Sequence, residues 1–164
     1  IVVGLAVWNF GAAFTVFVFP FLFTRFAMMA GNWGQHAFVD RHDPENNYRN
    51  SITCINCRYN RRCFNDGYHI GHHLRANRHW TDLPVEFERN VTRYATERAI
   101  VFEGIDFFEV WLLLMTKQHE KLASHMVDLD GPRSLEEKLA LIDERLEPIA
   151  VDAPDAMPGQ HATA

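Results

Sequence analysis

Apolar residues are concentrated at the start of the chain. Residues 1–39 hold one charged side chain, that of Arg25, and residues 1–19 (IVVGLAVWNFGAAFTVFVF) are apolar on every face of a helix. A helix without a polar stripe is typical of a segment surrounded by lipid. A second apolar stretch, residues 21–39, directly follows Pro20. The pattern therefore predicts membrane-spanning helix in residues 1–39.

Pro20 bears on how this segment is arranged. One continuous helix would rise about 1.5 Å per residue and would be much longer than a hydrocarbon core of roughly 30 Å. Proline also removes a hydrogen bond from a helix interior. We therefore expect two spans that turn near Pro20 and return His36 to the side of the membrane where the chain began. One long kinked helix and a buried hairpin of a soluble protein are the alternatives.

Polar residues are frequent from Asp40 onward. Residues 40–64 contain many turn formers and predict an irregular connection with short helical pieces. A helix is expected to begin at Asn65 or Asp66, either of which can cap free N–H groups. It should run toward Trp80, and the sequence DLP that follows should end it.

Helical periodicity continues in the second half of the chain. Apolar side chains recur at helical intervals across residues 85–129, and the carboxylates among them favour an interfacial or cytosolic helix over a span. Ser134 and Glu137 match a capping box, which predicts a short amphipathic helix within residues 131–147. The Pro- and Ala-rich residues 148–164 predict a disordered tail.

These elements together predict an all-α fold. Residues 1–39 would form an integral membrane helical bundle fragment with about two transmembrane helices. Residues 40–130 would form a cytosolic or interfacial helical region that holds the chemically interesting residues.

Charge and cysteine content limit the partners and the cellular compartment that the sequence allows. The net charge of −5 argues against a nucleic-acid partner, because phosphate binding needs an excess of Lys and Arg. Arginines nevertheless crowd residues 41–78, and basic residues beside a span favour the cytoplasmic side. A solvated arginine-rich loop would give the same pattern. The three cysteines, an odd number, fit a reducing compartment better than a disulfide framework.

Histidine spacing gives the strongest chemical signal. The sequence GYHIGHH places His69, His72 and His73 at positions i, i+3 and i+4, within a sector of roughly 100° on a helix. Neutral imidazole is a common ligand for iron, copper, zinc and nickel, so this face is a candidate metal site. His72 and His73 splay apart, which lets one helix serve two neighbouring ions. The alternative is a polar helix face.

Asn32 and His36 add a second signal at the end of the apolar segment. They are four residues apart and share one helix face. Polar groups at membrane depth are expensive and tend to mark function. We therefore predict that His36 binds metal, whereas a lone interfacial histidine is the alternative.

These residues resemble the carboxy-terminal half of the membrane fatty acid desaturase and hydroxylase family. The similarity covers roughly residues 20–84, through GNWGQHAFVD, NDGYHIGHH and HWTDLP. The HxxHH sequence is similar to the family's third histidine box. Asn32 and His36 are similar to an acyl-CoA desaturase pattern, in which the His binds one iron and the Asn reaches it through water.

The resemblance implies a non-haem di-iron centre that desaturates fatty acyl chains, carried as acyl-CoA or acyl lipid. It implies dioxygen and two electrons, from a donor protein of cytochrome b5 or ferredoxin type. It further implies an integral membrane protein, in the endoplasmic reticulum, with the histidine boxes facing the cytosol. The implied metal ligands, with no catalytic residue beyond them, are His36, His69, His72, His73 and, through water, Asn32.

The resemblance has gaps. The family's first and second histidine boxes are absent from this sequence, which starts within apolar residues at Ile1. The chain is therefore expected to be a C-terminal fragment that supplies about half of the ligands and is inactive alone. Asp66, His79 and Asp82 are candidates for partners that orient imidazole N–H groups.

Three other functions compete with desaturation. A fatty acyl hydroxylase shares the same histidine boxes, and a membrane scaffold would need no boxes at all. A zinc-binding module would use Cys54 and Cys57 with His69 and His73. The gap between the two pairs is one residue short of the usual twelve, which disfavours a zinc finger.

Overall fold

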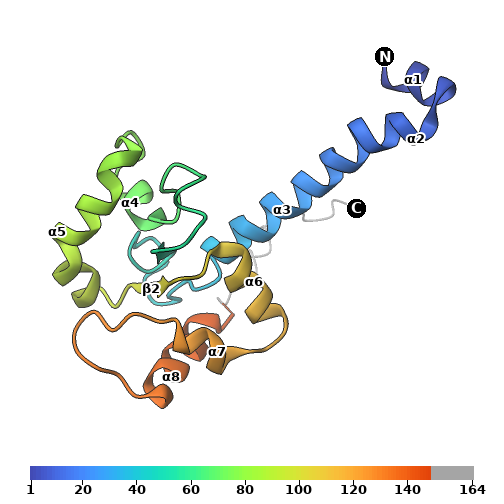
Figure 1. The fold of residues 1–164 in the computed structure, drawn as a ribbon. Helices are drawn as coiled ribbons and strands as arrows, with labels where there is room; N and C mark the ends of the chain where they lie inside the picture. The colour runs from blue at the N-terminus through green and yellow to red at the C-terminus, as the bar shows by residue number, and fades with distance from the viewer. Residues whose placement is uncertain (149–164) are drawn as a thin grey trace, which may run out of the picture.

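The computed structural model describes residues 1–148, in which a long apolar helix projects from a mixed, mostly helical domain (Figure 1). A short helix, α1 (Val2–Trp8), comes first, and the chain turns at Asn9. The helix α2 (Phe10–Ala13), a π-helical segment (Phe14–Val18) and α3 (Phe19–Gln35) then follow without interruption.

The expected turn at Pro20 is wrong, because the helix runs through it. One helix, Phe10–Gln35, is long and apolar enough to cross a membrane in the described part of the chain. Pro20 lies in the first turn of α3, directly after the π-helical segment. The wider π-helical turn makes room for the proline ring, which would otherwise clash with the carbonyl one turn earlier. The break falls instead at Asn9, whose side chain caps α2 through the Ala12 N–H.

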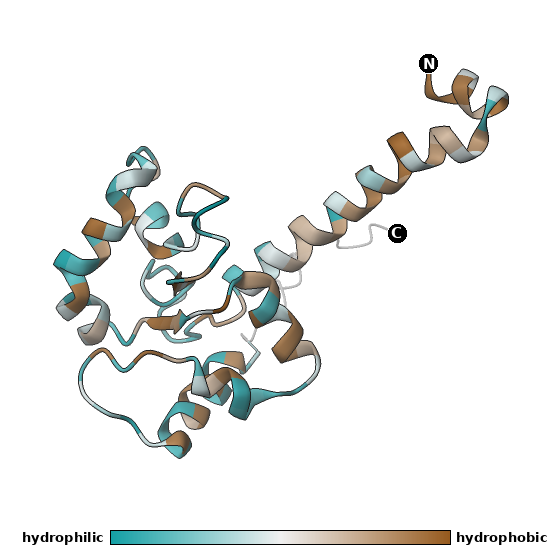
Figure 2. Ribbon diagram, viewed as in Figure 1, coloured by the Kyte–Doolittle hydropathy of each residue, from teal (hydrophilic) through white to brown (hydrophobic). Residues whose placement is uncertain are grey.

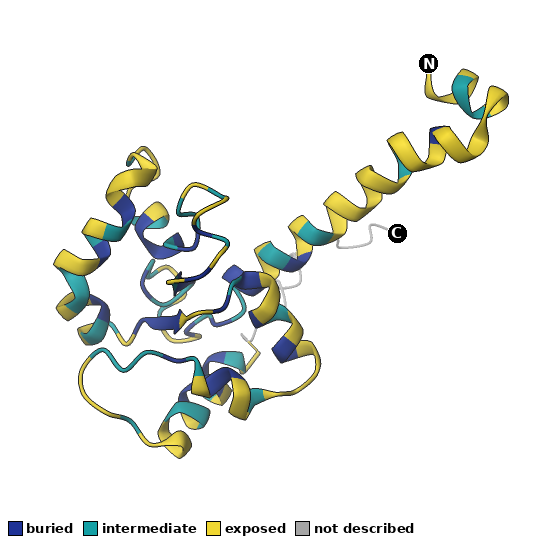
Figure 3. Ribbon diagram, in the orientation of Figure 1, coloured by how far each residue is buried: buried dark blue, intermediate teal, exposed yellow. Residues whose placement is uncertain are grey.

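The outer surface of this helix is apolar and unburied. Figure 2 shows that α3 is largely hydrophobic along its length, and Figure 3 shows that most of it is exposed. Only 6% of its most apolar window is buried within the chain. Exposing such an apolar surface to water costs free energy. A surface of this kind is typical of a helix that contacts lipid or other membrane helices.

A small parallel sheet differs from the prediction, because its first strand lies in the expected irregular connection and its second in the expected helix. The strands β1 (Ile52–Ile55) and β2 (Ile100–Glu103) pair with Ile52 opposite Ile100. The predicted continuous helical pattern over residues 85–129 is therefore wrong at β2, and the fold is not entirely helical. The strands contain β-branched residues and are buried on both faces, so they lack the alternation that identifies a half-buried strand.

Helices surround this sheet. The remaining helical elements of the described chain are α4 (His69–Leu74), a 3-10 helix (Trp80–Asp82), α5 (Leu83–Thr96), α6 (Phe107–Met115), α7 (His119–Ser124) and α8 (Leu135–Leu146). Ile52, Ile100 and Phe102 belong to an apolar cluster completed by α6, α7 and α8. Val101 belongs to a second cluster, shared with α4 and α5.

Two helix boundaries differ from the prediction and one agrees with it. The histidine-bearing helix starts at His69 rather than at residue 65 or 66, and it ends at Leu74. The sequence DLP begins α5 rather than ending a helix, because a proline in the first helical turn gives up no hydrogen bond. The predicted capping box of Ser134 and Glu137 is present at α8. The predicted tail, from residue 149 on, lies outside the described residues.

A buried ion cluster ties α8 to the segment that follows α3. The Arg145 side chain is 1% exposed, and its Nη2 lies 3.7 Å from Oδ2 of Asp40. Arg145 also donates to the carbonyls of Arg49 and Arg98, at 3.2 Å each. Arg49 approaches the same Asp40 oxygen at 3.3 Å. The carboxylate of Asp40 therefore balances two cations.

Gly34 sets the contact between α3 and α6. A Cβ atom at this position would overlap the backbone oxygen of Phe107 and would lie 3.3 Å from its carbonyl carbon. We therefore expect Gly34→Ala to destabilise the chain by about 1–3 kcal/mol, as overpacking does. Urea unfolding in detergent micelles measures the change.

Gly31 provides the matched control on the same helix. A Cβ atom there would meet nothing within 4 Å. Gly31→Ala should therefore leave stability unchanged or raise it slightly, since alanine favours helix. Equal destabilisation by both variants would contradict the assigned contact.

Candidate metal centre

Three histidines from two helices converge on one point. His36 ends α3, and its Nε2 lies 3.3 Å from Nε2 of His69. His73, one turn along α4, places its Nε2 3.2 Å from the same atom. The three ligand nitrogens lie within 4.8 Å of one another. Nitrogens held about 2.0–2.1 Å from one metal ion are separated by about 3 Å, so the spacing fits a shared ion.

Strand β1 positions the histidine-bearing helix. The Cys54 N–H donates to the carbonyl of Gly67 at 2.7 Å, two residues before His69. The Asn60 side chain bridges the same contact. Its amide N–H donates to the Cys54 carbonyl, and its amide oxygen accepts from the Gly67 N–H. A Cβ atom on Gly67 would overlap Asn60 and the Cys54 carbonyl oxygen. These hydrogen bonds therefore fix the turn before α4 against strand β1.

A backbone carbonyl and a nearby carboxylate each favour one tautomer, the first in His36 and the second in His69. Nδ1 of His36 lies 2.9 Å from the Asn50 carbonyl, which only accepts, so Nδ1 of His36 carries the proton. Nδ1 of His69 faces the Asp66 carboxylate at 3.8 Å, which favours a proton there too. Both Nε2 atoms then direct lone pairs at the same point. Such an arrangement is repulsive by itself and is suited to a cation.

His73 is held in the neutral form. Burial lowers the pKa of His73, and the neighbouring His69, His36 and His72 lower it further, to about 4. At neutral pH its imidazole therefore keeps a free lone pair, as a metal ligand requires.

Asp66 is the centre of a hydrogen-bond network behind His69. Tyr59 donates its hydroxyl to Oδ2 of Asp66 at 2.8 Å, and Gln35 donates its amide to the same oxygen at 3.2 Å. Burial acts to raise the pKa of Asp66, but the nearby His69, the hydrogen bond from Tyr59 and the nearby His72 outweigh it, so the pKa is lowered. The carboxylate stays ionised and can hold the proton on His69.

The other predicted site residues lie outside the three-histidine cluster. His72 is exposed and lines a different pocket, next to Trp80. Asn32 is exposed on α3, one turn before His36, and lines an apolar cleft. No contact between Asn32 and the histidine cluster is recorded among residues 1–148.

His79 and Asp82 are placed at the surface, away from the network around His69. Nδ1 of His79 lies 2.7 Å from the Thr81 hydroxyl and caps the 3-10 helix. Asp82 is exposed and accepts from the same hydroxyl at 3.4 Å. Of the three predicted orienting residues, Asp66 is the one beside a cluster histidine within the described chain.

Sequence reasoning missed Tyr59, Gln35 and Asn50. Gln35 precedes His36 directly, but α3 turns its side chain toward Asp66 rather than alongside the imidazole. Tyr59 and Asn50 belong to irregular connections, where spacing gives no information about direction.

An apolar cleft lies beside the cluster. It has a volume of about 570 Å³ and runs between α3 and α6, from Phe23 to Phe107. Tyr59 and Asp66 line the same cleft, so the network behind His69 borders it. An apolar chain could therefore lie along α3 and approach the histidines.

The cysteines take no part in this site. Cys54 is fully buried in β1, and burial raises its pKa well above the usual value for a thiol. A cysteine binds a metal ion as its thiolate, and this buried environment opposes loss of the thiol proton. Within residues 1–148, the candidate metal group contains His69 and His73 but neither Cys54 nor Cys57.

Asp66→Asn should weaken Fe²⁺ binding by about 10–100-fold, because the amide no longer holds the proton on Nδ1 of His69. Anaerobic titration of the purified chain measures the affinity. The control Asp82→Asn removes an exposed carboxylate and should leave the affinity unchanged. Equal losses in both variants would contradict the role given to Asp66.

Residues 1–103 match the family model described as fatty acid desaturase. This range contains every histidine of the cluster and the strands that position α4. Neither the curated proteins nor the solved structures yielded a match.

Proposed function

The chain belongs to the fatty acid desaturase family, and we propose that it supplies part of a non-haem di-iron site for O2-dependent desaturation of fatty acyl chains. Membership supports an oxidoreductase of the desaturase and hydroxylase type in lipid metabolism. The observation that carries the proposal is the convergence of three imidazole Nε2 atoms beside an apolar cleft.

In this proposal His36, His69 and His73 hold one iron, and Asn32 contributes through water. His72, on another side of α4, serves the second iron with ligands that lie outside this group. Iron held by neutral imidazoles would use dioxygen and two electrons to remove hydrogen from an unactivated acyl C–H bond.

The residues of the chain orient these ligands and receive the substrate. Asp66 keeps the proton on Nδ1 of His69, so that Nε2 stays available, and the Asn50 carbonyl does the same for His36. The cleft between α3 and α6 accepts the acyl chain, at about 0.8 kcal/mol for each buried methylene group. Filling it excludes water from Tyr59 and Asp66, which line the cleft beside His69.

The proposal also places the chain in a membrane. The helix Phe10–Gln35 spans the bilayer, and the domain from residue 40 onward faces the cytosol of the endoplasmic reticulum. An electron donor of cytochrome b5 or ferredoxin type reaches the site from that side. The acyl substrate arrives as acyl-CoA or as acyl lipid.

Expression in a desaturase-deficient host tests the proposal. Lipid analysis of hosts that express the complete protein, including the remaining ligands, should show new double bonds with the wild-type sequence and none with His73→Ala. The control His125→Ala alters a histidine bonded to the Glu103 carbonyl, away from the cluster, and should keep the activity. Normal unsaturation with His73→Ala would refute the ligand assignment, and hydroxylated lipid would identify the hydroxylase instead.

A further inference from the structure

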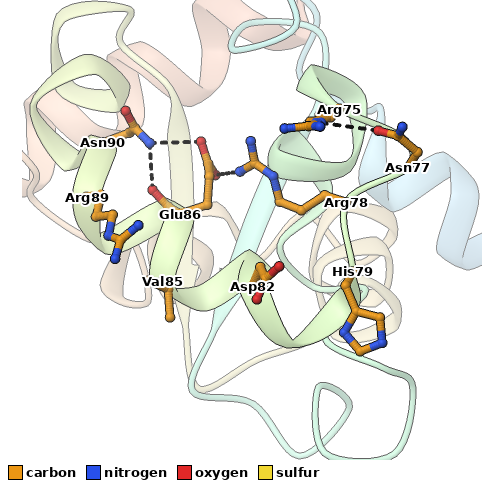
Figure 4. A pocket seen from close by; sticks show the side chains of 9 residues that line it. All are labelled: Arg75, Asn77, Arg78, His79, Asp82, Val85, Glu86, Arg89 and Asn90. Carbon is orange, nitrogen blue, oxygen red and sulfur yellow. Dashed lines mark hydrogen bonds and ion pairs between the residues drawn. The ribbon is translucent and has the colours of Figure 1, made fainter.

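A second, polar pocket lies where α4 ends and α5 begins. Its volume is about 630 Å³. Figure 4 shows its side chains, which come from the turn after α4 and from the first two turns of α5. The lining comprises three arginines and six other residues: Arg75, Arg78, Arg89, Asn77, His79, Asp82, Val85, Glu86 and Asn90.

Three arginines and two carboxylates line this pocket, which leaves a surplus of positive charge. Arg78 lies 3.2 Å from Glu86, whose carboxylate also accepts from Asn90 at 3.0 Å, so these two charges cancel. Arg75 and Arg89 form no ion pair within the described chain, and both are exposed. Asp82 is the remaining carboxylate in the lining. The pocket therefore keeps a positive surplus that an anion can neutralise.

Shared lining residues relate this pocket to two others, one of which borders Asp66 beside the three-histidine cluster. Arg78 also lines a pocket of about 440 Å³ that contains His72. That pocket in turn shares Tyr59 and Asp66 with the apolar cleft along α3. A basic pocket, a pocket that contains His72 and Asp66, and an apolar cleft thus adjoin one another in this order. This order of polarity suits an amphiphile with an anionic head and an apolar tail.

We propose that Arg75 and Arg89 bind phosphate groups of the acyl carrier, so that the basic pocket selects the substrate by its head. The inference rests on the proposed function, because it assigns the acyl chain to the cleft. Guanidinium groups bind phosphate through paired N–H donors, which suits Arg75 and Arg89. Helix α5, whose first two turns line the pocket, lies across the domain from the apolar α3 (Figure 1). This position favours a water-soluble phosphorylated carrier over a membrane phospholipid.

Calorimetric titration of the metal-free chain in detergent micelles with coenzyme A tests the site. Arg75→Ala and Arg89→Ala should each weaken binding by about tenfold, as loss of a charge-assisted hydrogen bond does. Asp82→Asn should strengthen binding, because it removes a repulsive carboxylate from the lining. The matched control Arg61→Ala removes another exposed arginine, which lies outside the pocket, and should change the affinity little.

Other probes identify the source of the phosphate. Pantetheine, which lacks phosphate, should bind much more weakly than coenzyme A. If phosphatidic acid in nanodiscs requires Arg75 and Arg89 while coenzyme A does not, the anion site stands and its ligand is a lipid head. Equal weakening by Arg61→Ala, or no binding of either probe, would overturn the proposal. Because the titration needs neither iron nor turnover, its failure is separate from a failure of the proposed desaturation.

Discussion

His69→Ala should reduce the Fe²⁺ affinity of the chain by more than about 100-fold. Its Nε2 is the atom that lies close to both other cluster nitrogens, at 3.3 Å from His36 and 3.2 Å from His73. Loss of a residue that only orients a ligand lowers metal affinity about 10–100-fold, and loss of the ligand itself lowers it further. Anaerobic titration with Fe²⁺, followed by thermal unfolding with and without the ion, measures the effect.

His72→Ala is the informative comparison, because His72 belongs to the same HxxHH sequence. The imidazole of His72 is exposed and lies outside the three-histidine group. Binding of a single Fe²⁺ to the chain should therefore survive this substitution, even where desaturation does not. Equal loss of affinity in the two variants would show that the three-histidine cluster is not the binding site.

Asp40→Asn should destabilise the domain by about 3 kcal/mol. The substitution leaves the guanidinium of Arg145 buried without its carboxylate, and breaking a buried ion pair costs about 3–5 kcal/mol. Arg145 keeps its two carbonyl partners, which places the loss at the lower end. Urea unfolding in micelles gives the difference. The control Asp130→Asn breaks an exposed pair with Arg133 and should cost less than about 1 kcal/mol.

The same carboxylate predicts an acid response. Burial acts to raise the pKa of Asp40, but the His42 N–H, Arg145 and Arg49 outweigh it and hold the pKa below its usual value. A depressed folded-state pKa gives stability that is present above the unfolded value of about 3.9. That contribution is lost as the pH falls through the folded-state pKa. The wild-type chain should therefore lose more stability than Asp40→Asn between pH 5 and pH 2, as linkage requires.

Features encoded within a few residues could be read from the sequence. The capping box of Ser134 and Glu137 needs only the helix between them, and it is present. His69 and His73 are one helical turn apart, so their convergence follows from local geometry. Their meeting with His36 depends on the tertiary fold, and only the place of His36 at the end of the apolar segment and the family resemblance pointed to it.

Features that depend on distant partners could not be read in this way. The strands at Ile52 and Ile100 are buried on both faces, and a short apolar run of this kind looks the same as buried helix. Pro20 was expected to break a helix, yet the π-helical segment before it absorbs the ring. Tyr59 reaches Asp66 through an irregular turn that no periodicity describes.

The parallel pairing of β1 with β2 makes the geometry of the three-histidine cluster a late event during synthesis. The turn before α4 is hydrogen-bonded to β1, but the strand that pairs with β1 begins only at Ile100 and is synthesised later. A ribosome therefore releases the apolar helix and all three cluster histidines well before the chain can bring them into register. Closing such a long connection is slow compared with forming a local helix. Nascent chains halted before residue 100 should thus reach the bilayer yet fail to retain iron.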